Sequence, residues 1–216
     1  MLPVISIVGR SGTGKTVLIE RLITEFKKRG YHVATVKHCL SGFEIDQPGK
    51  NSWRFAKAGS DAVLISSPDR LAFIKNVDHD PHIEEILHVI GSEFDFVLAE
   101  GFKQSEIPKI EVHRKELGDD LLCSVQVLSA IVSDAPLDIE DIPQFSLNDT
   151  TAVADFIEKN FIPEDRSDTF LSVNGKPVFI KPFVKDVIAK TLLAMVSTLK
   201  GIGKVKSLDI SIKSKL

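Results

Sequence analysis

Residues 4–16 have the sequence Val-Ile-Ser-Ile-Val-Gly-Arg-Ser-Gly-Thr-Gly-Lys-Thr. Their first five residues are a short, nearly continuous apolar run, which is typical of a strand buried on both faces of a parallel sheet. From Lys15 to Gly30 apolar residues recur at helical spacing, and residues 31–36 are again apolar. A strand, a loop, a helix and a second strand therefore predict a β-α-β unit with parallel strands.

The loop between the first strand and the helix matches the pattern G-x-x-x-x-G-K-[ST]. Its glycines let backbone N–H groups converge on an anion, and the start of the helix adds a favourable dipole. We expect Lys15 to reach the β- and γ-phosphates of a nucleotide and the Thr16 hydroxyl to bind Mg²⁺. A purely structural glycine turn is the alternative, which the strand before and the helix after disfavour. The predicted phosphate-binding residues are Gly9, Ser11, Gly12, Thr13, Gly14, Lys15 and Thr16.

An acid is also needed to organise Mg²⁺, usually at the end of a neighbouring apolar strand. Glu100 follows the apolar run 94–99, and ligands of open α/β sheets bind beyond the carboxyl ends of the strands. We therefore favour a metal role for Glu100 over a cap that merely ends the strand.

Further elements alternate along the chain and predict an α/β fold, a P-loop NTPase with a mostly parallel sheet flanked by helices. We assign it to residues 1–166. A helix is expected to open with Asp80 as its N-cap and Pro81 as its first residue. Other strands are predicted at 61–66, 71–75, 94–99, 109–112 and 130–132, and other helices at 51–58 and 150–159.

Residues 167–216 differ from the rest in charge and pattern. They contain 9 Lys and 3 Asp, net +6, whereas residues 1–166 contain 18 Lys+Arg and 27 Asp+Glu, net −9. A hairpin around Asn174-Gly175, a helix at 183–199 and a strand at 207–212 predict a small α+β appendage. The helix is apolar around more than one stripe, so it should bury most of its circumference. It packs either on its own hairpin or on a second copy or partner enzyme, where opposite charges would steer association. A membrane-surface role is a third alternative, which the scattered Lys residues disfavour.

Composition limits the classes of function. With 216 residues, 43% hydrophobic and net charge −3, the chain is typical of a globular protein and does not indicate nucleic acid as its main partner. Two cysteines, Cys39 and Cys123, cannot form a disulfide framework and favour the cytoplasm. We expect no membrane span, because no apolar run reaches the length of one.

Several motifs together resemble the molybdopterin-guanine dinucleotide biosynthesis adaptor family (MobB). The resemblance extends from about residue 5 to 161 and implies a GTP-binding protein with weak GTPase activity. It also implies assistance to a guanylyltransferase that joins GMP to molybdopterin, and we predict a homodimer. The motifs are residues 9–16, Val36-Lys37-His38, Asp46-Gln47-Pro48-Gly49-Lys50-Asn51-Ser52, Ala56-Lys57-Ala58-Gly59, Glu100-Gly101-Phe102-Lys103 and Ile131-Val132-Ser133-Asp134.

The resemblance also implies roles for single residues. Gly9, Gly14, Lys15 and Thr16 match the family's phosphate and Mg²⁺ ligands. Glu100 matches its acid and is the predicted catalytic residue, and Asp46 matches an acid after the second strand and is a further predicted metal ligand. The chain departs from the family at Asn51, where an acid is usual, and at Cys39-Leu40-Ser41, where the family is richer in histidine.

Guanine selection cannot come from an Asn-Lys-x-Asp motif, because the sequence has none. Asp134 follows a predicted strand, and its carboxylate could accept hydrogen bonds from N1–H and the 2-amino group of guanine. An Asx turn at Asp134-Ala135-Pro136 explains the same residue equally well.

Two other classes of P-loop protein compete with the adaptor. A small-molecule kinase needs a lid with arginines, yet residues 111–126 offer only Arg114 and Lys115 as cations. A metal-delivery GTPase usually has a His- or Cys-rich tract, which this sequence does not show.

Overall fold

The computed structural model describes residues 2–91, 93–118, 120–163, 169, 171–173, 176–178, 180–205, 208 and 210–212. The chain divides into two compact units, Leu2–Pro163 and a second that contains Glu164–Leu216. The boundary predicted after Arg166 lies outside the described residues. In the described part of the chain, no helix is long and apolar enough to cross a membrane.

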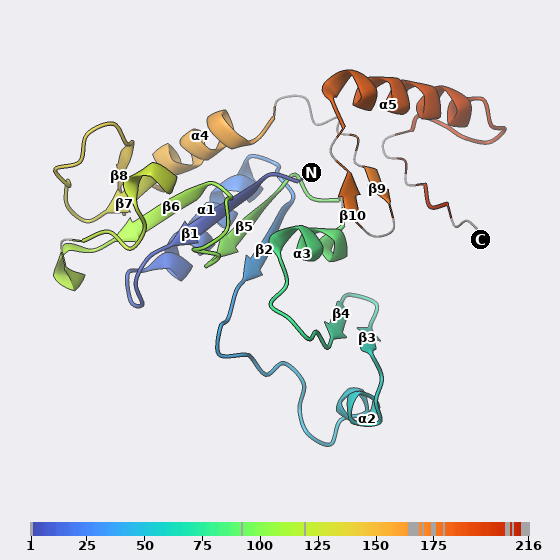
Figure 1. The fold of residues 1–216 in the computed structure, drawn as a ribbon, viewed down its shortest axis with the longest axis horizontal. Coiled ribbons are helices and arrows are strands. Elements are labelled where there is room, and N and C mark those ends of the chain that lie inside the picture. Colours follow the sequence, from blue (N-terminus) through green and yellow to red (C-terminus); the bar gives the residue numbers. More distant parts are fainter. Residues whose placement is uncertain are drawn as a thin grey trace. The chain divides into compact units, whose positions relative to one another are not determined.

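The first unit is built on a six-stranded sheet (Figure 1). Its strand order is β2-β5-β1-β6-β7-β8, and every neighbouring pair is parallel. This confirms the prediction of a mostly parallel sheet flanked by helices. The strands are β1 (Val4–Val8), β2 (Val33–Lys37), β5 (Phe96–Glu100), β6 (Lys109–His113), β7 (Leu128–Ser133) and β8 (Gln144–Ser146).

One face of the sheet is covered by α1 (Lys15–Lys28) and α4 (Thr150–Phe161). Leu18, Leu22 and Phe26 of α1 are buried, as their spacing of four residues along one helix face predicts. They pack on alternate residues of the strands, among them Ile5 and Ile7 of β1. This apolar layer fixes α1 against β1 and so fixes the loop that joins them.

The opposite face is covered in part by α3 (Ile83–Ile90), whose Ile83 and Leu87 pack on β2 and β5. The prediction that Asp80 caps this helix is wrong, because His82 is the N-cap. The Asp80 carboxylate instead lies 2.9 Å from His38 Nε2, while Glu85 accepts a hydrogen bond from the His82 N–H at 3.1 Å. Asp80 thus contacts a side chain from a distant segment instead of capping the helix.

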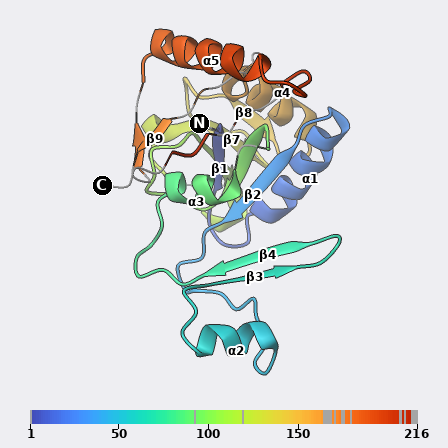
Figure 2. The same cartoon turned by 90° about the vertical axis from the view of Figure 1, so that its right-hand side faces the viewer.

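A separate antiparallel hairpin and a short helix lie between β2 and α3. In both views they lie away from the six-stranded sheet (Figures 1 and 2). The predicted elements at these positions are confirmed: α2 (Asn51–Lys57), β3 (Ala62–Ser66) and β4 (Leu71–Lys75). In their described residues, the crossovers from β5 to β6 and from β6 to β7 have no α-helix, although two short 3-10 helices, η1 (Lys115–Leu117) and η2 (Val125–Val127), lie in the second.

The second unit contains an antiparallel hairpin, β9 (Leu171–Val173) and β10 (Lys176–Val178), and the helix α5 (Pro182–Ser197). Asn174 and Gly175, the predicted turn, lie outside the described residues. None of the residues of α5 is buried, so the expectation that this helix buries most of its circumference is wrong for the single chain. Of the predicted strand at 207–212, residues 208 and 210–212 are described and do not form a strand.

Candidate functional site

The glycine-rich loop follows β1 and ends where α1 begins. Gly9 has a φ of 147°, and a Cβ there would lie only 2.4 Å from the carbonyl oxygen of Val112 in β6. Gly12 and Gly14 also have positive φ, 81° and 96°. Only glycine adopts such conformations without strain, so each glycine of the motif stands where the backbone requires one.

Ser11 is exposed in the middle of this loop, whereas Thr13 is 1% exposed. The Thr13 hydroxyl donates to the Arg10 carbonyl oxygen at 3.0 Å. This bond closes the loop on its inner side and leaves its outer side free for a ligand.

Lys15 is the first residue of α1, and its amine donates to the Arg10 carbonyl oxygen at 2.8 Å. Burial lowers the pKa of this amine below its ordinary value; Glu100 opposes the shift, and the positive charges of Lys103 and Lys37 add to it. The amine therefore lies folded over the loop, with an acid and two further cations nearby.

Glu100 stands at the carboxyl end of β5, and the strand register pairs it with Ile7 of β1. Its Oε2 accepts a hydrogen bond from Thr16 Oγ1 at 3.1 Å, and its Oε1 lies 3.4 Å from Lys37 Nζ. A hydroxyl and a carboxylate are oxygen ligands of the type that Mg²⁺ prefers, so the two predicted ligands fit that ion. Lys37 balances the charge of the carboxylate.

Asp46, the other predicted metal ligand, has its hydrogen bonds within its own loop. Its Oδ1 accepts from the Gln47 N–H and from Ser52 Oγ, both at 2.9 Å. No described contact joins it to Thr16 or Glu100. Among the described residues, no group of three or more His, Cys, Asp or Glu could hold a metal ion, and Mg²⁺ sites that use substrate phosphates usually need only one or two protein ligands.

Asp134 lies on the other side of the loop, at the end of β7. Its Oδ1 accepts from the Lys115 N–H at 3.1 Å, and its Oδ2 lies 3.8 Å from Arg114 Nη1. Arg114 in turn donates from Nε to the Thr13 carbonyl oxygen at 3.1 Å. The described bonds of this carboxylate thus reach the segment after β6. The Asx turn considered above would need an N–H donor at residue 136, which is a proline and has none, and the Ala135 N–H bonds Ser133 Oγ.

Arg10 and Arg114 are the residues of the site that sequence reasoning did not select. Arg10, within the loop, donates to the carbonyl oxygens of Leu117 at 2.9 Å and Asp120 at 3.3 Å. The glycine-rich loop and the segment after β6 are thus tied together by one arginine from each. The only signal in the sequence was that Arg114 lies two residues after the strand predicted at 109–112.

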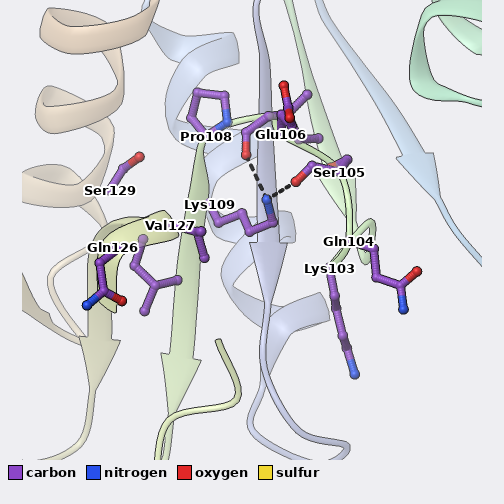
Figure 3. Close-up of a pocket in the computed structure, with 11 residues that line it drawn as sticks. Lys103, Gln104, Ser105, Glu106, Pro108, Lys109, Gln126, Val127 and Ser129 are labelled. Carbon is purple, nitrogen blue, oxygen red and sulfur yellow. Dashed lines mark hydrogen bonds between the residues drawn. The ribbon is translucent and has the colours of Figure 1, made fainter. Parts of the chain in front are cut away.

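A hollow of about 480 Å³ lies elsewhere, beside the start of β6 (Figure 3). Lys109 reaches into its wall, where its amine donates to the carbonyl oxygens of Ser105 and, at 3.1 Å, Ile107. Since parallel strands begin at one edge of the sheet and end at the other, this hollow is separate from the glycine-rich loop.

The comparisons with known proteins agree with this architecture. The sequence matches the family "Molybdopterin guanine dinucleotide synthesis protein B" (MobB) over residues 4–134. It is 35% identical to the "Molybdopterin-guanine dinucleotide biosynthesis adapter protein" of Haemophilus influenzae, covering 73% of this chain and 88% of that protein.

A second relative extends over almost the whole chain. The "Putative molybdopterin-guanine dinucleotide biosynthesis adapter protein" of Methanocaldococcus jannaschii is 27% identical over 97% of both chains. Among solved structures, "molybdopterin-guanine biosynthesis protein B (mobB)" superposes with a TM-score of 0.56 at 29% identity, covering 72% of this chain and 97% of that one. The chain therefore belongs to the MobB family, which confirms the resemblance inferred from its motifs.

Proposed function

We propose that this protein binds GTP and Mg²⁺ at the glycine-rich loop and acts as an adaptor in molybdopterin-guanine dinucleotide biosynthesis. The observation that carries the proposal is the contact of Thr16 with Glu100, 3.1 Å, next to Lys15 and a loop in which each motif glycine has positive φ. N–H donors, a cation and an acid for the metal are the parts that triphosphate binding needs. Bound Mg²⁺ would neutralise phosphate charge, with Thr16 and Glu100 as its protein ligands.

The contacts of Glu100 fit slow hydrolysis of GTP better than fast hydrolysis. Glu100 already accepts a hydrogen bond from Thr16 and pairs with Lys37, so it is better placed to orient the metal and its waters than to take a proton. We therefore assign Glu100 a metal-organising role in a weak GTPase.

Substitution of Lys15 tests nucleotide binding. Lys15→Ala removes the cation that faces the phosphates, and we expect calorimetry to show no measurable GTP binding in the presence of Mg²⁺. Lys27→Ala, at the far end of the same helix, is the matched control and should bind as the parent does. Equal affinity of the Lys15 variant and the parent would refute the nucleotide site.

The metal role of Glu100 has its own test. Glu100→Gln keeps the shape of the side chain and removes its charge, so GTP binding should become less dependent on Mg²⁺ concentration. An unchanged Mg²⁺ dependence would leave Glu100 as a strand cap only.

The proposed partner is a guanylyltransferase that joins GMP to molybdopterin. Support comes from the family and from the word "adapter" in the names of the relatives. Co-purification with that enzyme from the same source, with GTP present, tests it. We expect the parent to recover the guanylyltransferase and the Lys15→Ala variant not to recover it. Phosphorylation of a small molecule by the isolated protein would favour a kinase instead.

We also propose that the protein is a cytoplasmic homodimer, with the β3–β4 hairpin between the copies. An isolated two-stranded hairpin is marginally stable in water, and this one has Leu64, Ile65, Leu71 and Phe73 exposed. A second copy suits the charges too: antiparallel pairing of Ala72 with its counterpart would place Asp69 opposite Lys75. Light scattering should show dissociation of Phe73→Ser but not of Val89→Ser, a change at an exposed apolar residue of α3. A monomeric parent would refute the dimer.

A further inference from the structure

Arg114 joins two parts of the candidate site that come from distant segments. It follows β6, the strand between β1 and β7 in the sheet. One edge of its guanidinium donates to the carbonyl oxygen of Thr13 in the glycine-rich loop at 3.1 Å. Another nitrogen of the same group lies 3.8 Å from Oδ2 of Asp134. One side chain thus bridges the phosphate loop and this carboxylate.

Asp134 is also held from its other oxygen, which accepts the Lys115 N–H at 3.1 Å. The side chains of Arg114 and Asp134 are only 35% and 33% exposed. A carboxylate fixed by two neighbours has a defined direction, which a group that reads a base must have.

We propose that Arg114 is a positioning residue for guanine selection: it holds the Asp134 carboxylate at a fixed place relative to the phosphate loop, so that one nucleotide engages both. The proposal rests on the GTP binding proposed above. Arginine has the required chemistry, because its planar group can donate to a carbonyl and a carboxylate at once, and a lysine presents a single flexible ammonium.

Two of the three nitrogens of the guanidinium are engaged away from the phosphates in this arrangement. Its Nε donates to a backbone carbonyl of the loop and its Nη1 faces Asp134, while Nη2 lies beside Gly14. Its effect should therefore be visible in the choice of base and less in the affinity for the triphosphate group.

A change of base specificity tests the role of Asp134 first. The carboxylate accepts from guanine N1–H and the 2-amino group, whereas xanthine has a carbonyl at that position and suits the N–H₂ of an amide. Asp134→Asn should therefore bind GTP roughly tenfold more weakly and xanthosine triphosphate roughly tenfold more tightly than the parent. A gain of binding cannot arise from a misfolded variant.

The role of Arg114 is then tested by measuring nucleotide affinities in the same way. Arg114→Ala should lower the ratio of GTP to ATP affinity roughly tenfold, and added to Asp134→Asn it should abolish the gain in xanthosine triphosphate affinity. Arg114→Lys keeps the positive charge, so it should bind ATP as the parent does, but it should still bind GTP more weakly and so lose the preference for guanine.

Arg21→Ala is the matched control. Its guanidinium also donates to a loop carbonyl, that of Leu147 at 3.3 Å, but on the exposed side of α1; its GTP to ATP ratio should equal that of the parent. Arg114→Ala with weaker binding of GTP and ATP in equal measure would overturn the positioning role and leave the nucleotide site intact. A parent that binds GTP no better than the Lys15→Ala variant would overturn the proposed function, and this inference with it.

Discussion

The two faces of the six-stranded sheet are built by different physical means. The face under α1 and α4 is an apolar layer in which Phe26 is completely buried and packs edge-on against Tyr31 and Phe96, with ring centroids 5.5 and 4.7 Å away. The opposite face along β6 presents Lys109, Glu111 and His113, which are 2%, 1% and 4% exposed. Burial is equally deep on both faces, but only one of them is hydrophobic at this strand.

Each polar side chain on β6 binds the backbone of a loop that covers it. The amine of Lys109 donates to two carbonyls of the segment 101–108. The carboxylate of Glu111 accepts from two N–H groups of the segment after β6, at 2.6 and 2.9 Å. His113 donates from Nε2 to a carbonyl of that same segment at 2.9 Å.

This difference follows from the crossovers. A helix satisfies most of its own backbone hydrogen bonds, so the sheet beneath it needs only apolar volume. The two crossovers that flank β6 show no α-helix over 101–108 and over the described part of 114–127, and their buried N–H and C=O groups need partners from elsewhere. Charged residues on this strand are therefore structural, and they hold the segment that positions Arg114.

The largest effect is expected on the helix-covered face. Phe26→Ala removes a completely buried ring from the layer between α1 and the sheet, and should lower the free energy of unfolding by about 3–5 kcal/mol. Urea denaturation followed by circular dichroism measures it. Val89→Ala, at a position 59% exposed, should change it by less than about 0.5 kcal/mol. Similar losses in both variants would mean that this layer is not the core.

The next largest effect is expected at Glu111. Glu111→Ala leaves the N–H groups of Leu122 and Cys123 without their acceptor and should cost about 2–3 kcal/mol of unfolding free energy. Hydrogen exchange at these two amides should also become faster. Glu111→Gln keeps an acceptor and should cost less; an alanine variant as stable as the parent would contradict a structural role for the polar face.

Local patterns were sufficient to predict the glycine-rich loop between β1 and α1 and much of the fold. The strand before Gly9, the helix after Lys15 and the strand that ends at Glu100 each follow from the spacing of apolar residues. Glu100 reaches Thr16 because the carboxyl ends of parallel strands share an edge, which is a rule of topology and needs no coordinates. The hairpin at 62–75 was predicted from the turn residues between its two strands.

Contacts between distant segments that no rule of topology dictates were not predictable. Arg114 donates a hydrogen bond to Thr13, which is 101 residues away in the sequence. The Asp80 carboxylate, predicted to cap a helix, instead contacts His38, which is 42 residues away. The alternation Lys-Ile-Glu-Val-His in β6 is typical of a strand with one solvated face, and nothing local shows that loops cover it. The strand at Gln144–Ser146 was missed because three residues are too short to form a pattern.

A smaller effect is expected at Lys109. Lys109→Met keeps the apolar stem and removes the amine that donates to the carbonyls of Ser105 and Ile107. The adjacent hollow of about 480 Å³ is open to water, which can replace the lost donor (Figure 3). We expect a loss of about 1 kcal/mol in unfolding free energy, less than that of Glu111→Ala. A larger loss for Lys109→Met than for Glu111→Ala in urea denaturation would show that water does not replace the lost donor.

The smallest effect concerns the thiol beside Glu111. Burial raises the pKa of Cys123 above its ordinary value, and the negative charge of Glu111 adds to the shift. A thiol whose pKa is higher in the folded state keeps its proton there, so it destabilises the fold as pH rises above the ordinary thiol pKa. With Cys39→Ser as background, the rate of alkylation of Cys123 against pH should have its midpoint at lower pH in Glu111→Gln than in the parent. Loosening of the covering segment would raise the alkylation rate of Cys123 at every pH. The midpoint of the pH profile is therefore the quantity that reports the charge of Glu111. Equal midpoints would mean that burial alone sets the pKa, and the polar face would then influence its surroundings only through hydrogen bonds.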